Sequence, residues 1–153
     1  MKLDHKRALD AFDDFLMIMD DQLDWLIDQA EAREIDLDGS PESLERLERL
    51  HDVMVPALDE DGCSALRVVF ARYLGEYVRT RHGGQWTLPL DDPKDVNFNR
   101  PVIVGHSSCR WLEFNPIRTM RAYALRPYPG MLREIIEHSV APTILDLTDL
   151  LEE

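Results

Sequence analysis

Apolar residues recur every three or four positions through the middle of the chain, and this stretch predicts a central helix. Its wide apolar face lies between residues 64 and 82, at Leu66, Val69, Phe70, Tyr73, Leu74, Tyr77 and Val78. Ser64 is a candidate N-cap, because its hydroxyl can accept a hydrogen bond from a first-turn amide. The pair Gly83 and Gly84 predicts the end of the helix, since glycine adopts the left-handed conformation without steric cost.

A glycine lies inside this predicted helix. Gly75 costs roughly 1 kcal/mol relative to alanine there, so we expect another element to cross the helix closely at this position. Residues 85–88 then alternate in the manner of a β-strand up to Pro89. The predicted unit is a helix, a Gly-Gly turn and a strand, which share a core around Trp86.

A second apolar pattern predicts a long helix over residues 5–33. Its seam repeats with spacings of three and four residues at Leu9, Phe12, Leu16, Met19, Leu23, Leu26 and Ala30. Phe15 and Trp25 widen the seam, which favours packing inside a globular fold over a two-stranded coiled coil. A homodimer formed through this helix is the alternative.

The other elements are shorter. Residues 40–54 predict a helix that starts at Ser40 and Pro41. Residues 102–104 predict a buried strand that pairs antiparallel with residues 85–88, and residues 110–114 are a candidate third strand. The expected fold class is therefore α+β and mainly helical, with the long N-terminal and central helices packed on a small antiparallel sheet of two to four short strands.

Two helices are expected near the C-terminus. Asn115 is a candidate cap for a helix that begins at Pro116, and a further helix follows over residues 131–138. Residues 141–153 form an apolar and acidic tail, for which docking as a helix and a loose conformation are both open.

Length and charge divide the chain into three parts of one expected domain, which has 153 residues. Residues 1–60 are an acidic helical part with 18 acidic and 6 basic residues. Residues 61–140 form the αβ part, and the acidic tail follows. The net charge of −13 argues against direct binding of nucleic acid, because phosphate contacts need a positive surface.

The sequence favours a cytoplasmic protein without a membrane span. It has no apolar run near the ~18 residues that a span needs, and its first residues are too acidic for a signal peptide. The two cysteines, Cys63 and Cys109, are isolated, which favours reduced thiols over a disulfide.

Two groups of charged residues are candidate binding sites. The first is acidic and lies on the polar side of the N-terminal helix, at Asp20, Asp21, Asp24 and Asp28. It predicts a negative surface for a basic partner, against a simple solvated face. The second is the pair Arg118 and Arg121, three residues apart near a helix start, which is suited to an anion or an acidic surface.

One motif carries candidate chemistry. The run from Val102 to Cys109, VIVGHSSC, resembles the nucleophile elbow of α/β-hydrolases, with Ser107 as the nucleophile. It departs from that family because Cys109 replaces the second glycine and no clear helix follows. A cysteine nucleophile, Cys109 with His106 or His82, is a related alternative.

Cofactor and metal motifs are absent from the sequence. The five histidines and two cysteines show no HExxH or CxxC spacing, and the chain has neither a Walker loop nor a GxGxxG motif. We therefore expect neither a cofactor nor a metal.

Three segments carry a resemblance to a known kind of domain: SPESLERLERL, YLGEYVRTRHGGQW and EFNPIRTMRAYALRP. Together they resemble small bacterial domains of unknown function, over roughly residues 35–132. The resemblance implies a small acidic accessory or immunity-type protein, and it assigns no functional residue. The leading hypothesis is thus a non-enzymatic protein-binding domain, immunity-like or antitoxin-like. The alternatives are a small hydrolase and a structural homo-oligomer.

Overall fold

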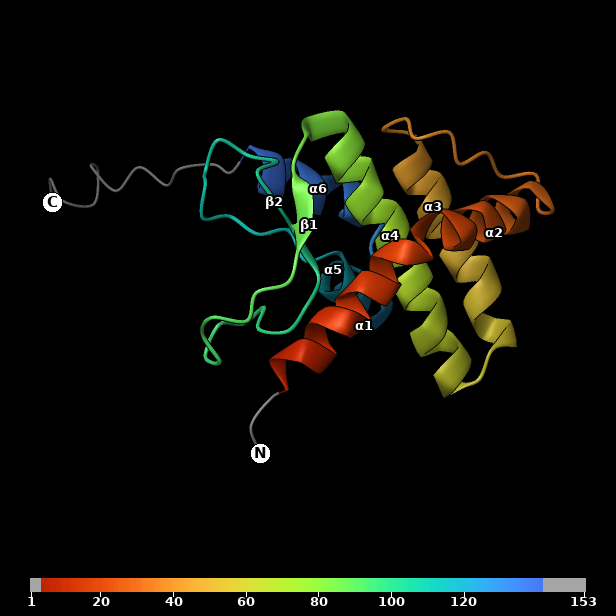
Figure 1. Cartoon of the computed structure of the whole chain (residues 1–153). Coiled ribbons are helices and arrows are strands. Elements are labelled where there is room, and N and C mark those ends of the chain that lie inside the picture. Colours follow the sequence, from red (N-terminus) through yellow and green to blue (C-terminus); the bar gives the residue numbers. More distant parts are fainter. Residues whose placement is uncertain (1–3, 142–153) are drawn as a thin grey trace, which may run out of the picture.

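The structure is a computed structural model of the chain, and it describes residues 4–141. The longest helix, α4 (Glu60–His82), lies at the centre, and the other elements pack around it (Figure 1). In chain order these are α1 (His5–Met17), α2 (Met19–Glu31), α3 (Ser43–Met54), the 3₁₀ turn η1 (Val55–Ala57), β1 (Gln85–Thr87), β2 (Val102–Val104), α5 (Pro116–Leu125) and α6 (Met131–Val140). The expected α+β, mainly helical fold class is confirmed.

The start of α4 differs from the sequence prediction. Asp59 is its N-cap, with a carboxylate that accepts a hydrogen bond from the amide of Gly62 at 2.8 Å. The helix therefore begins four residues before Ser64, because an aspartate cap followed by two acidic residues suits the positive end of the helix dipole. The predicted end is confirmed: Gly83 and Gly84 follow the last turn with φ of 86° and 102°.

The expected helix over residues 5–33 is divided at Ile18 into α1 and α2. In an unbroken helix the Phe15 carbonyl would accept a hydrogen bond from the Met19 amide. Here it accepts one from the guanidinium of Arg72, a side chain of α4 that is buried. A buried side chain that takes a backbone carbonyl out of the helical ladder is a known cause of such breaks.

The sheet has two strands. β1 and β2 pair antiparallel, as predicted, with Trp86 opposite Ile103. The third candidate strand, residues 110–114, is reduced to one bridge, in which Ile103 and Phe114 exchange two backbone hydrogen bonds of 2.8 and 2.9 Å. Arg110 and Trp111 form a turn, and Leu112 and Glu113 have no regular structure, so only Phe114 of this segment pairs with the sheet.

The helix starts were predicted with mixed accuracy. The Asn115 cap is confirmed, since its side chain accepts a hydrogen bond from the amide of Arg118 at 3.0 Å. At α3 the Ser40 hydroxyl accepts one from the amide of Ser43, but regular helix begins only at Ser43. α6 begins at Met131 as expected. The predicted tail over residues 141–153 lies, after its first residue, outside the described residues.

Trp86 explains the glycine inside α4. Its indole lies directly on Gly75, and a Cβ added there would overlap the six-membered ring. The same indole meets the ring of Phe15 edge-on at 5.1 Å, and the Arg72 guanidinium lies over Phe15 at 3.9 Å. The expected close crossing is confirmed, and one cluster joins α1, α4 and β1.

The described chain has two further general features. No helix within residues 4–141 has both the length and the apolar character that crossing a bilayer requires. Cys63 and Cys109 are both free thiols and half-buried.

We predict that Gly75→Ala destabilises the fold by about 1–3 kcal/mol, because the new methyl group overpacks against the indole. The gain in helix propensity, about 1 kcal/mol, only partly offsets this. Urea unfolding followed by circular dichroism measures the change. In a Trp86→Phe background the same substitution is expected to cost less, since the smaller ring leaves space. An equal cost in both backgrounds would contradict the proposed contact.

Candidate functional site

The predicted acidic residues lie on one exposed surface. Asp20, Asp21, Asp24 and Asp28 are all exposed, whereas Met19, Leu26 and Ala30 of the same helix are buried. Because residues three or four apart share a helix face, the aspartates occupy the side of α2 that faces away from α4. We call the exposed side of α1 and α2 the acidic face.

Apolar side chains are exposed within the acidic face. Met17 is 79% exposed, and Ile18 and Trp25 are each 43% exposed. They alternate with Asp14, Asp21 and Asp28 at helical spacing. Such a mixture of large apolar side chains and like charges differs from an ordinary solvated helix, and large exposed apolar groups mark interaction surfaces.

The charges of the acidic face are not compensated locally. Among residues 4–141, the carboxylates of Asp38, Glu45 and Glu76 form ion pairs with arginines, and Asp52 lies 3.4 Å from the ring nitrogen of His51. No aspartate of α1 or α2 takes part in them. The face therefore projects a negative field into solvent.

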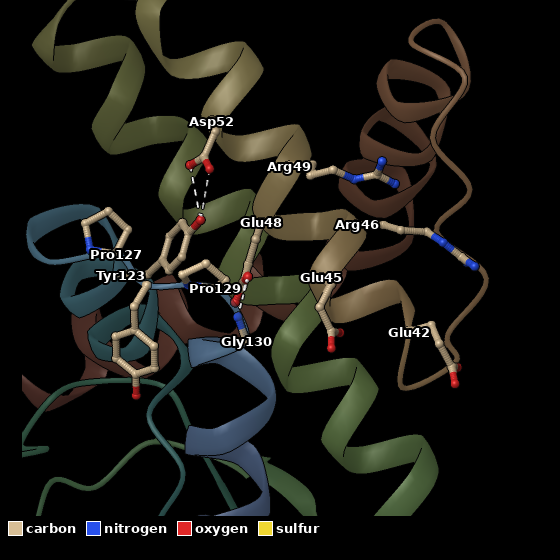
Figure 2. A pocket seen from close by; sticks show the side chains of 11 residues that line it. Glu42, Glu45, Arg46, Glu48, Arg49, Asp52, Tyr123, Pro127, Pro129 and Gly130 are labelled. Carbon is tan, nitrogen blue, oxygen red and sulfur yellow. Dashed lines mark hydrogen bonds between the residues drawn. The ribbon is translucent and has the colours of Figure 1, made fainter.

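A hollow of about 560 Å³ lies between α3 and the link from α5 to α6 (Figure 2). Its lining residues are Glu42, Glu45, Arg46, Glu48, Arg49, Asp52, Tyr123, Pro127, Tyr128, Pro129 and Gly130. Four of its lining residues carry carboxylates, and this composition makes the hollow a candidate binding site.

The best-buried carboxylate of this hollow is used to hold the fold. Glu48 accepts a hydrogen bond from the amide of Gly130 at 3.0 Å (Figure 2) and another from the amide of Leu132, also at 3.0 Å. α6 has glycine at its N-cap position and no local side-chain cap. Glu48 thus caps α6 from a distant helix, where a carboxylate also suits the positive end of the dipole.

Asp52 is also engaged, since the Tyr123 hydroxyl donates to its two oxygens at 3.2 and 3.1 Å. Burial, and then the charge of Asp52, raise the pKa of Tyr123. Behind them His51 lies edge-on to the rings of Phe70 and Tyr123, and burial lowers the pKa of His51. These contacts lock α3 onto α4 and α5, so the hollow is largely a structural seam.

A second hollow brings the predicted arginines together. Arg118 and Arg121 of α5 line a groove of about 440 Å³, where Arg100 from the loop before β2 joins them. No carboxylate within residues 4–141 forms an ion pair with any of the three. We call this the arginine groove. It has the donors that bind carboxylates or phosphates.

The Gly105–Cys109 turn does not assemble the predicted nucleophile pairs. His106 is buried, and its Nε2 lies 2.9 Å from the hydroxyl of Ser139 on α6. Ser107 instead accepts a hydrogen bond from the amide of Cys109 at 3.2 Å. Within the described residues, neither Ser107 nor Cys109 has a histidine as hydrogen-bond partner. Burial lowers the pKa of His106, which favours its neutral form.

Metal chemistry finds no support in the described part of the chain. No group of three His, Cys, Asp or Glu side chains gathers closely enough there to hold a metal ion.

No protein-family model, no curated protein and no solved structure matches the chain. Its candidate sites therefore rest on its own geometry.

Sequence reasoning missed two contributors. Glu48 had a usable signal, because Gly130 at the start of α6 leaves that helix without a local cap. Arg100 had none, since it lies in an irregular segment and reaches the arginine groove only through the path of the chain.

We predict that Glu48→Gln lowers the free energy of unfolding by about 1–3 kcal/mol, because it weakens two charge-assisted hydrogen bonds at the start of α6. Urea titration measures the loss. Glu45→Gln, which breaks the half-exposed ion pair with Arg133 on the same two helices, is the matched control and should cost no more than about 1 kcal/mol. Equal losses would contradict the capping role.

We predict that His106 makes the fold less stable in mild acid. The pKa of His106 is lowered in the folded chain from its usual value of 6.5, so the unfolded chain binds a proton first as the pH falls through that value. The contribution of neutral His106 to the free energy of unfolding is therefore fully present above pH 6.5 and decreases as the pH falls below that value. The measurement is the free energy of unfolding at pH 7.5 and at pH 5.5. We expect it to decrease less between these two pH values in His106→Gln than in the unaltered chain. The substitution of an exposed histidine, His5→Gln, is the control and should decrease as much as the unaltered chain.

Proposed function

We propose that this protein is a non-enzymatic protein-binding domain and that the acidic face of α1 and α2 binds its partner. The partner would carry a basic surface with an apolar centre. The observation that carries the proposal is the exposure of Met17 and Trp25 among aspartates that have no ion-pair partner within residues 4–141.

Charge and apolar area would have separate roles in such a complex. The aspartates Asp20, Asp21, Asp24 and Asp28 would attract a basic partner over a distance and speed association. Met17 and Trp25 would be buried on contact and slow dissociation, since methionine and aromatic side chains are enriched at interface centres. This division makes the two halves of the proposal testable independently.

Small acidic proteins that cover a basic surface include immunity and antitoxin proteins, and an inhibitor of this kind is the finer proposal. The fold supports it in one respect: Arg72 and Trp86 hold α1 to the central helix. The acidic face is therefore presented on packed helices, which reduces the ordering cost of binding.

A homo-oligomer through the N-terminal seam has less support. The part of the seam on α2, with Met19, Leu26 and Ala30, is buried within the chain. Leu23 of α2 is half-buried, and the exposed seam residues Leu9 and Leu16 lie on α1.

The test uses the full chain as bait in a lysate of the source cells, followed by binding kinetics with the retained partner. Replacing Asp20, Asp21, Asp24 and Asp28 by lysine is expected to slow association at low salt by tenfold or more, because steering becomes repulsion. Met17→Ala with Trp25→Ala is expected to speed dissociation while association changes little.

A matched control reverses four other exposed acids, Glu60, Asp61, Asp91 and Glu137. This control changes the net charge by the same amount as the four aspartate substitutions. Two of its residues, Glu60 and Asp61, lie in the first turn of α4. The proposal predicts a much smaller effect from this control. Recovery of the bait without any salt-sensitive partner, or equal slowing by both sets, would contradict the role of the acidic face.

A further inference from the structure

The arginine groove is formed by two segments that are separated in sequence. The loop before β2 supplies Val96 and Arg100, and α5 supplies Arg118 and Arg121. Three arginines therefore line one hollow of about 440 Å³, and no acidic residue lines it with them. A hollow of this volume is of the size that small molecules occupy in proteins.

Buried hydrogen bonds hold the two segments together. The side-chain amide of Asn115, the cap of α5, donates to the side-chain oxygen of the buried Asn97 at 3.0 Å. The oxygen of Asn115 in turn accepts the hydrogen bond from the backbone amide of Arg118. Asn97 also donates to the carboxylate of Glu113 at 3.0 Å. The groove is therefore in place before a ligand arrives, which reduces the ordering cost of binding.

The charge of the groove requires an anion. Within residues 4–141, none of Arg100, Arg118 and Arg121 forms an ion pair with a carboxylate. Asn115 and Arg118 also place the groove at the first turn of α5, where the helix dipole adds positive potential. Guanidinium groups donate in pairs to the oxygens of carboxylates and phosphates. The ligand that these donors fit is an oxyanion.

The rest of the groove is largely aliphatic. Leu125 is 73% exposed and Val96 is 68% exposed, and the half-buried Ile117 and Ala122 line the groove with them. A bare anion would leave these side chains in water, whereas a hydrocarbon chain would bury them. No aromatic residue lines the groove, so the base of a nucleotide would have no aromatic ring to stack on.

We propose that the arginine groove binds a small aliphatic oxyanion, namely a carboxylate or phosphate monoester that carries a linear hydrocarbon chain. Its oxygens accept hydrogen bonds from the three arginines, and its chain covers Leu125 and Val96. The volume of the hollow and its aliphatic lining favour this ligand over an acidic protein surface. The inference goes beyond the proposed function, because the groove and the acidic face lie on different elements.

Isothermal titration calorimetry on the full chain tests the proposal with four probes. Octanoate and octyl phosphate carry the chain, whereas acetate and inorganic phosphate supply the same head groups without it. We expect each chain-bearing anion to bind at least about tenfold more tightly than its own head group, because every buried methylene adds affinity. The tighter of the two chain-bearing anions identifies the head group that the arginines select.

Two double variants test the two halves of the site. Arg118→Gln with Arg121→Gln should weaken the binding of octyl phosphate at least about tenfold, because both charge-assisted contacts are lost. Leu125→Ser with Val96→Ser should remove most of the advantage of octyl phosphate over inorganic phosphate. All four residues are exposed, so the circular dichroism spectrum and the melting temperature should stay close to those of the unaltered chain.

A matched control separates the groove from general charge effects. Arg110→Gln with Arg126→Gln removes the same charge at exposed positions outside the groove, and should leave the binding of octyl phosphate unchanged. Absence of binding by both chain-bearing anions, or equal weakening by the control, would overturn the proposal. Equal affinity with and without the chain would show a simple anion site and would overturn it as well. Binding of polyglutamate without binding of octanoate or octyl phosphate would assign the groove to an acidic protein surface instead.

Discussion

The contact of Trp86 with Gly75 organises much of this structure. The indole can lie on the central helix only because position 75 has no side chain. The same indole lies edge-to-face with the ring of Phe15, and the Arg72 guanidinium lies over that ring. One close approach therefore fixes how the strand, the central helix and the N-terminal helices meet, and a packed interior transmits a change at any of these residues to the others.

The buried Arg72 shows how the fold handles an expensive group. Its guanidinium has no carboxylate partner among residues 4–141. Its Nη1 donates to the Phe15 carbonyl and the Met19 sulfur, the group lies over the Phe15 ring, and its Nε has no hydrogen-bond partner among these residues. Burial of an unpaired cation is costly, so these contacts are part of what holds α1 and α2 in place. The break at Ile18 follows from the same interaction, and it exposes Met17 and Ile18 on the acidic face.

Charge is separated between surfaces of one small chain. The acidic face carries aspartates that form no ion pair within residues 4–141, while the lining of the arginine groove has three arginines and no carboxylate. Each surface therefore keeps unpaired charge that is available to a ligand of the opposite sign.

The sequence determined the features that depend on neighbours along the chain. The 3.6-residue spacing, the Gly83–Gly84 stop, the Asn115 cap and the alternation around Trp86 are local signals, and each corresponds to an observed element. Gly75 even indicated a close crossing. The tertiary structure decided what depends on distant groups: the break at Ile18 requires Arg72, the start of α6 requires Glu48, and the arginine groove requires Arg100. None of these pairs is close in sequence, because hydrogen bonds and cavities form between elements whose meeting is set by packing.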